Sequence, residues 1–194
     1  MSGNQAPEFT WPDDDISRVP YQVYTDADIY AREQAQIFQG PTWNFLCLEA
    51  ELPNPGDYKT TFVGEASIIV TRDDDGAING LLNRCAHKGA LVCYKPCGNT
   101  RHLTCVYHNW SYDLDGNLAA VAFSKGVGGQ GGLPDDFETA GHGLQRLRIE
   151  TYRGLIFGTF SGETPAFTDY MGPELLARID RVLIKPLTVL GYHR

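Results

Sequence analysis

Four candidate metal ligands in two short pairs constrain this chain more than any other feature. Cys85 and His87 form a C-x-H pair, and Cys105 and His108 form a C-x2-H pair, with residues 88–104 between them. Each pair puts one thiolate and one imidazole within a single tight loop, so two such loops can face each other across a small metal centre. The chain must therefore fold so that these two loops meet.

Two kinds of metal centre use two cysteines and two histidines. Zinc-finger spacing puts the two cysteines together and the two histidines together, whereas cysteine and histidine alternate here. Alternation favours a mixed-ligand [2Fe–2S] cluster, with zinc as the alternative. Neutral imidazoles remove negative charge from one iron, which raises the reduction potential to between about −150 and +300 mV, against about −400 mV for all-cysteine plant-type clusters.

Composition narrows the classes of function further. The net charge is −8 and there is no long run of Lys or Arg, which argues against nucleic-acid binding. The polar, acidic N-terminus lacks the features of a secretory signal, and no stretch reaches the roughly 18 apolar residues that span a membrane. We therefore expect a cytoplasmic protein, in which the five cysteines bind metal or stay reduced rather than form disulfides.

The pattern of residue types divides the chain into three parts. Residues 1–41 form an N-terminal arm whose helix is expected to begin at a capping-box-like Thr25-x-x-Asp28. Residues 42–160 consist of short strand-like segments and are expected to form small antiparallel sheets. Residues 161–194 are expected to contain a helix and then a strand that has only just begun. The predicted fold class is mainly β.

Expected strands and turns follow the alternation of apolar and polar residues. Asp75-Gly76 supplies a hairpin turn, and a glycine-rich loop covers about residues 124–143. The C-terminal helix is expected over 173–183 and the C-terminal strand over 185–194. Further strands are expected over 42–50, 58–64, 67–72, 78–83, 144–150 and 154–160.

The residues around the four ligands resemble a known family. CAHKGA (85–90) and CVYHNWSYDLDG (105–116) are similar to the cluster-binding segment of Rieske non-heme iron oxygenases, the aromatic ring-hydroxylating family. WNFLCLEAELPNPGDYKTTFVGE before it and VAFSKGVGGQGGLPDDF after it resemble the large (alpha) subunits of the terephthalate dioxygenase, salicylate 5-hydroxylase and anthranilate dioxygenase type. The resemblance extends over about residues 17–194.

This resemblance implies a Rieske-type [2Fe–2S] domain whose cluster is held by Cys85, His87, Cys105 and His108. Respiratory Rieske proteins have an additional disulfide under the cluster and a serine that donates a hydrogen bond to it. The equivalent positions here are Ala90, Tyr107 and Trp110. Because fewer groups donate hydrogen bonds to the cluster sulfurs, we expect a reduction potential in the lower part of the Rieske range.

Two residues near the ligands depart from the family pattern. Lys88 stands where the family often has Arg, and Asn109 stands where it often has Gly or Ala. Neither is an expected ligand. Asn109 is expected to affect hydrogen bonding around the cluster, and Lys88 a surface contact.

The resemblance also implies an enzyme system. We expect the iron–sulfur part of an NADH-dependent dioxygenase, an oxidoreductase of aromatic compound catabolism that accepts electrons from a ferredoxin or a flavin reductase. The electrons are expected to pass to a mononuclear Fe(II) that uses O₂ to hydroxylate an aromatic carboxylate. This iron is expected in a C-terminal catalytic domain, of which residues 161–194 are only the truncated start. The implied assembly is a homotrimer of large subunits with a small beta subunit.

No catalytic residue is assigned within these 194 residues, and the chain alone is expected to lack oxygenase activity. The alternative is a free-standing Rieske ferredoxin that only carries electrons. Such carriers are small β domains, so the arm before residue 42 and the helix after residue 160 favour the oxygenase.

Other cysteines and aromatic residues are interpreted as structural. Cys93 and Cys97 are expected to be free surface thiols, and Cys47 to be a small core residue. Trp110 is expected to pack in the β core or over the ligand loops, and His142 to lie in a surface turn.

Overall fold

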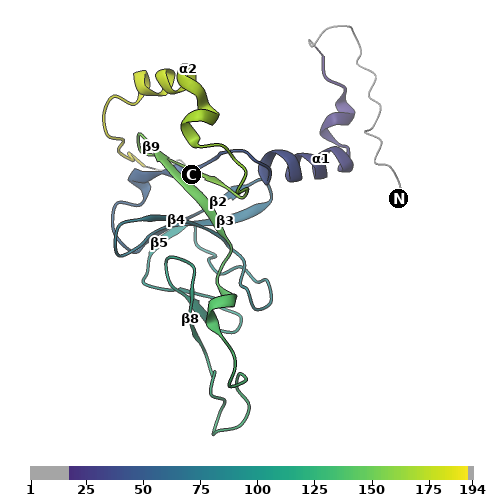
Figure 1. The fold of residues 1–194 in the computed structure, drawn as a ribbon, viewed down its shortest axis with the longest axis vertical. Helices are drawn as coiled ribbons and strands as arrows, with labels where there is room; N and C mark the ends of the chain where they lie inside the picture. Colours follow the sequence, from purple (N-terminus) through teal and green to yellow (C-terminus); the bar gives the residue numbers. More distant parts are fainter. Residues whose placement is uncertain (1–17, 192–194) are drawn as a thin grey trace.

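The structure is a computed structural model that describes residues 18–191 (Figure 1). It is mainly β, as predicted. Seven strands form one antiparallel sheet in the order β1-β10-β9-β4-β3-β2-β5, and three short strands form a second in the order β6-β7-β8. The larger sheet consists of β1 (Asn44–Leu48), β2 (Asp57–Val63), β3 (Ala66–Arg72), β4 (Ile78–Leu82), β5 (Cys97–Asn99), β9 (Arg146–Tyr152) and β10 (Leu155–Thr159). The smaller sheet consists of β6 (Leu103–Thr104), β7 (Trp110–Tyr112) and β8 (Leu118–Val121).

Helices lie around these sheets. α1 (Ala27–Glu33) continues into a π-helical turn, η2 (Gln34–Phe38), and α2 (Phe167–Val182) lies near the C-terminus. Three short 3-10 turns are η1 (Tyr21–Tyr24), η3 (Glu49–Glu51) and η4 (Thr139–His142). In Figure 1 the smaller sheet and the long connection from β8 to η4 lie at the opposite end of the molecule from α2. No helix in residues 18–191 is long and apolar enough to cross a membrane.

β3 is the centre of the core. Ile68, Ile69 and Val70 are each completely buried, because this strand has apolar neighbours on both faces. Ile68 and Val70 belong to a core with Leu46 and Ile156, whereas Ile69 belongs to a second core that includes Cys85 and Cys105. Since successive side chains of a strand point to opposite faces, one face of the sheet carries a purely structural core and the other supports the ligand loops.

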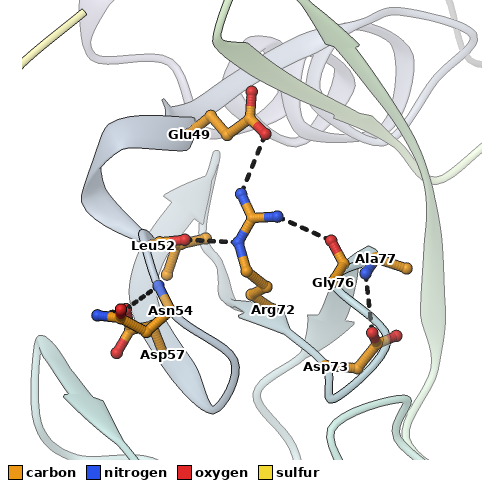
Figure 2. A network of polar contacts seen from close by, with 8 residues as sticks. All are labelled: Glu49, Leu52, Asn54, Asp57, Arg72, Asp73, Gly76 and Ala77. Atoms are coloured by element: carbon orange, nitrogen blue, oxygen red, sulfur yellow. Dashed lines mark hydrogen bonds and ion pairs between the residues drawn. The ribbon is translucent and has the colours of Figure 1, made fainter.

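A polar network fixes the C-terminal end of β3, next to the first of those cores (Figure 2). The guanidinium of Arg72, at the end of β3, donates to the carbonyl oxygens of Leu52 (2.6 Å) and Gly76 (2.8 Å). It also pairs with the Glu49 carboxylate at 3.0 Å. In the adjacent turn, Asp73 accepts a hydrogen bond from the Ala77 N–H. One side chain therefore ties β3 to η3 and to its own hairpin turn, which is the turn predicted at Asp75-Gly76.

Six of the seven predicted strands, those before residue 161, each overlap an observed strand. β5, β6, β7 and β8 were missed, because segments of two to four residues are too short to show alternation. The predicted cap of the first helix was wrong. The N-cap is Asp26, whose carboxylate accepts from the N–H groups of Asp28 and Ile29, while the Thr25 hydroxyl donates to the Gln22 carbonyl instead.

The C-terminal predictions were partly wrong. The helix predicted from Pro173 is present. A kink at Gly172, where φ is 70°, separates it from an earlier helical turn of α2 that begins at Phe167 and was not predicted. Phe167 is buried against Trp43 and Phe157 and anchors this earlier turn. No strand forms over residues 185–191, because this segment pairs with no strand in the described chain, and residues 192–194 lie outside that part. The division at residues 41 and 160 stays a prediction.

Candidate metal centre

The two ligand loops have the same pattern of backbone hydrogen bonds. In the first, the Gly89 N–H donates to the Cys85 carbonyl at 2.9 Å, and the Cys85 N–H donates to the Ala90 carbonyl at 2.8 Å. In the second, the Asn109 N–H donates to the Cys105 carbonyl at 2.9 Å, and the Cys105 N–H donates to the carbonyl of Trp110 at 2.9 Å. Each loop is thus a closed turn that starts at its cysteine and fixes the direction of the following histidine.

The same position in both turns has a left-handed backbone. Gly89 has φ of 75° and Asn109 has φ of 54°. Asparagine adopts this conformation more readily than most residues that have a side chain. The departure noted at Asn109 is therefore compatible with the turn, and its backbone repeats the geometry of the first loop.

The turns bring the four predicted ligands together. The imidazole rings of His87 and His108 lie with centroids 4.7 Å apart. Cys85 and Cys105 are 4% and 1% exposed, whereas His108 is exposed and His87 is partly buried. The thiols therefore lie on the inner side of the site and the imidazoles on its outer side.

One ring nitrogen at this site needs a partner. His87 Nδ1 is buried and makes no hydrogen bond within residues 18–191. A buried polar atom without a partner is costly, and a metal ion is one group that would satisfy it. Burial, together with His108 and Lys88, also lowers the pKa of His87, which favours the neutral ring that a metal ligand requires.

The donor set suits a dinuclear cluster. Among the residues that the structure describes, no three His, Cys, Asp or Glu side chains are placed to hold one metal ion. A [2Fe–2S] cluster does not need such a group, because each iron takes two protein ligands and two bridging sulfides. Two thiols, two imidazoles and an orphaned Nδ1 therefore fit a [2Fe–2S] cluster.

Tyr112 is a site residue that no sequence pattern had indicated. Its side chain is completely buried, its hydroxyl lies 3.2 Å from Cys85 Sγ, and it accepts a hydrogen bond from the Ala86 N–H at 3.1 Å. When the sulfur is a thiolate, the hydroxyl is the donor of the first bond. Burial and the contact with Cys85 raise the pKa of Tyr112, so the hydroxyl keeps its proton.

Asn83 is a second missed residue and holds the far end of the first loop. Its Oδ1 accepts from the N–H groups of Val92 (2.9 Å) and Cys93 (2.8 Å), and its Nδ2 donates to the Cys93 carbonyl at 2.8 Å. Nδ2 also donates to the Ser67 hydroxyl at 3.2 Å, which links the loop to β3. No local spacing would have identified either Asn83 or Tyr112, since both act through contacts distant in sequence.

Trp110 packs over the ligand loops, as predicted, but His142 does not lie in a free surface turn. The Trp110 ring is stacked on His87, with centroids 4.8 Å apart and an interplanar angle of 6°. His142, in η4, is half-buried, and its ring centroid lies 5.7 Å from that of Trp110. The turn predicted for His142 is present as η4, but its ring is not free at the surface, because η4 lies against the ligand loops.

The other cysteines stay outside the site. Cys47 is buried, as predicted, and burial raises the pKa of its thiol to about 12. Cys97 is exposed as predicted. Cys93 is half-buried rather than at the surface, and burial raises its pKa to about 11.

Comparison with known proteins agrees with this geometry. Residues 42–128 match a family described as Rieske [2Fe-2S] domain. The chain is 50% identical over 98% of its length to the large subunit of anthranilate 1,2-dioxygenase from Burkholderia cepacia, of which it covers 45%. It is 50% identical over 90% of its length to the terminal oxygenase component subunit alpha 2 of terephthalate 1,2-dioxygenase from Comamonas sp, of which it covers 42%.

Solved structures show the same fold. A naphthalene 1,2-dioxygenase with indole bound in its active site superposes with a TM-score of 0.71 at 33% identity, over 78% of this chain and 33% of that chain. A Rhodococcus sp. naphthalene 1,2-dioxygenase gives a TM-score of 0.75 at 34% identity, over 84% of this chain and 36% of that chain.

The fold and the matched family define the class of protein to which the chain belongs, because they show that it contains a Rieske [2Fe–2S] domain. More narrowly, it belongs to the large (alpha) subunits of the Rieske aromatic ring-hydroxylating oxygenases. The chain spans less than half the length of these curated relatives.

Proposed function

We propose that Cys85, His87, Cys105 and His108 hold a [2Fe–2S] cluster through which this chain accepts and passes on one electron at a time. The observation that carries this proposal is the meeting of two equivalent turns, which puts two buried thiols inside and two imidazoles outside, one with an orphaned Nδ1. When bound, such a cluster would supply one-electron chemistry, at a reduction potential above that of all-cysteine clusters and in the lower part of the Rieske range.

The protein's own residues have three tasks at this site. Asn83 holds the first loop against β3, so the ligands keep their positions when the charge changes. Tyr112 donates a hydrogen bond to the Cys85 sulfur, and such bonds favour the reduced cluster. His108 is exposed, which puts one ligand at the surface where a redox partner can approach.

The complete protein would be the large subunit of an aromatic ring-hydroxylating dioxygenase. We place this chain in such an enzyme rather than among free-standing Rieske ferredoxins, because 98% of its length aligns with a dioxygenase large subunit. Its electrons would come from NADH through a flavin reductase, with or without a ferredoxin. They would leave for a mononuclear Fe(II) that hydroxylates an aromatic carboxylate with O₂.

The likeness to anthranilate and terephthalate dioxygenase subunits supports an aromatic acid as the substrate class. The proposed assembly is a homotrimer of large subunits with small beta subunits, in the cytoplasm.

Reconstitution of the 194-residue chain tests the cluster assignment. We expect two irons and two acid-labile sulfides per chain, and a rhombic EPR signal with a low average g value after reduction with dithionite. The variant His87→Ala should lose the signal. His102→Ala, a change at an exposed histidine close in sequence to the second loop, should keep it. An EPR-silent protein with stoichiometric zinc would refute the assignment.

A further inference from the structure

An aromatic ring covers one of the two candidate histidine ligands. Trp110 is 5% exposed and lies parallel to His87, with an interplanar angle of 6° and a centroid distance of 4.8 Å. Trp110 begins β7, directly after the second ligand loop. A side chain attached to one loop therefore sets the environment of a ligand on the other.

Two further rings support Trp110. The Phe137 ring lies 5.9 Å from it at 79°, and the His142 ring lies 5.7 Å from it at 68°, both edge-to-face arrangements that aromatic pairs prefer. Phe137 and His142 also contact each other at 4.5 Å. His142 Nδ1 lies 2.9 Å from the Glu138 carbonyl, which can only accept, so this hydrogen bond fixes the imidazole.

The two ligands differ in this support. His108 is exposed, and its near ring neighbours besides His87 are limited, within residues 18–191, to the exposed Tyr107 at 3.8 Å. His87 instead has a buried tryptophan on its face, supported by two residues from the C-terminal part of the glycine-rich loop. The structure thus combines one imidazole that packs against a supported tryptophan, that of His87, with one that is exposed, that of His108.

We propose that Phe137 and His142 are positioning residues which act through Trp110 to fix the plane of His87 and to keep water from its face. The inference rests on the proposed function, since it assigns these residues a role toward the cluster. It extends that function to residues 137–142, outside the segment that contains the ligands.

The expected direction of the change in reduction potential follows from the charge of the cluster. A cluster with two thiolates and two neutral imidazoles is uncharged when oxidised and carries one negative charge when reduced. Water stabilises the charged form more, and the apolar shell around a metal site controls how much water reaches it. Loss of the supporting rings should therefore raise the reduction potential, and a less fixed His87 should broaden the EPR lines.

The test compares three kinds of variant in the reconstituted 194-residue chain. Phe137→Ala, His142→Ala and the double variant remove the supporting rings. His142→Phe and Phe137→Tyr keep a ring at each position. His102→Ala is the matched control, since its exposed imidazole makes no ring contact in the described part of the chain. Iron and sulfide content, melting temperature, reduction potential and EPR line shape are measured for each.

We expect full cluster content throughout, and broadened EPR lines in the alanine variants. At a fixed solution potential, their ratio of reduced to oxidised cluster should rise about threefold or more, the scale of one aromatic contact. The ring-retaining variants should stay close to wild type. Potentials and line shapes equal to those of His102→Ala, in folded and loaded variants, would overturn the inference. Failure of the wild-type chain to bind iron and sulfide would instead refute the proposed function.

Discussion

When its sulfur is a thiolate, Cys85 accepts a side-chain hydrogen bond from the Tyr112 hydroxyl, and this contact differs in kind from the backbone bonds that shape the loop. The backbone bonds at Gly89 and Ala90 set where the sulfur lies. The hydroxyl of Tyr112, 3.2 Å from the sulfur, acts on its charge. Since reduction adds negative charge to the cluster, a donor at this distance stabilises the reduced state more than the oxidised state.

The change Tyr112→Phe should therefore lower the reduction potential while iron content stays the same. The Ala86 N–H also loses its acceptor, which should cost about 1–3 kcal/mol in the free energy of unfolding. Redox titration and denaturant unfolding measure the two effects. Tyr94→Phe, at an exposed tyrosine, is the control and should change neither. A potential unchanged in Tyr112→Phe would contradict the assigned donor.

The four candidate ligands could be proposed from the sequence because their signal is local. Cys85 and His87 differ by two positions, and the alternation of residue types distinguishes this set from a zinc finger. Tyr112, Asn83 and Phe137 were not predictable, because each acts on a residue that is distant in sequence or belongs to another loop. Sequence spacing therefore indicated the candidate ligands but not the residues that contact them.

At the scale of elements, strand length decided what could be predicted. The strands of five to seven residues, such as β2 and β3, contain enough β-branched and aromatic residues to be recognised and were found, whereas β6, with two residues, was not. β6 exists because Leu103 and Thr104 pair with Tyr112 and Ser111 of β7. Tertiary pairing, not local preference, forms the small sheet that carries the second ligand loop.

Arg72 joins three elements, and its replacement should destabilise the fold without touching the ligands. In Arg72→Met, the carbonyl oxygens of Leu52 and Gly76 lose their donor (Figure 2), and we expect a loss of about 1–3 kcal/mol in the free energy of unfolding. Arg178→Met is the control. It removes an exposed ion pair with Glu174 and should cost well under 1 kcal/mol. Equal losses in chemical denaturation of the two variants would contradict the role of Arg72.

At the scale of the whole molecule, the two faces of β3 contact two different cores. One face packs Ile68 and Val70 into a core that contains no candidate ligand. The other face packs Ile69 into the core that includes Cys85 and Cys105. Stability and redox function therefore share one strand but use opposite sides of it.

Removal of the cluster by a chelator under reducing conditions should affect these faces differently. Amide hydrogen exchange should rise in residues 84–92 and 104–110, because the ligand loops lose their common metal centre. The amides of Ile68 and Val70 should remain protected, since they lie in a strand paired on both sides. Mass spectrometry of peptides after exchange measures both. Collapse of protection in β3 would show that the cores are not independent.

The arrangement of β3 also bears on how the protein matures in a cell. A core that excludes the ligands can assemble before any iron arrives. We expect the newly made chain to fold this core first, and its two ligand loops to become ordered when the cluster is inserted. A cluster destroyed by oxygen could then be replaced on the same folded molecule, and oxidative damage would call for repair rather than for new synthesis.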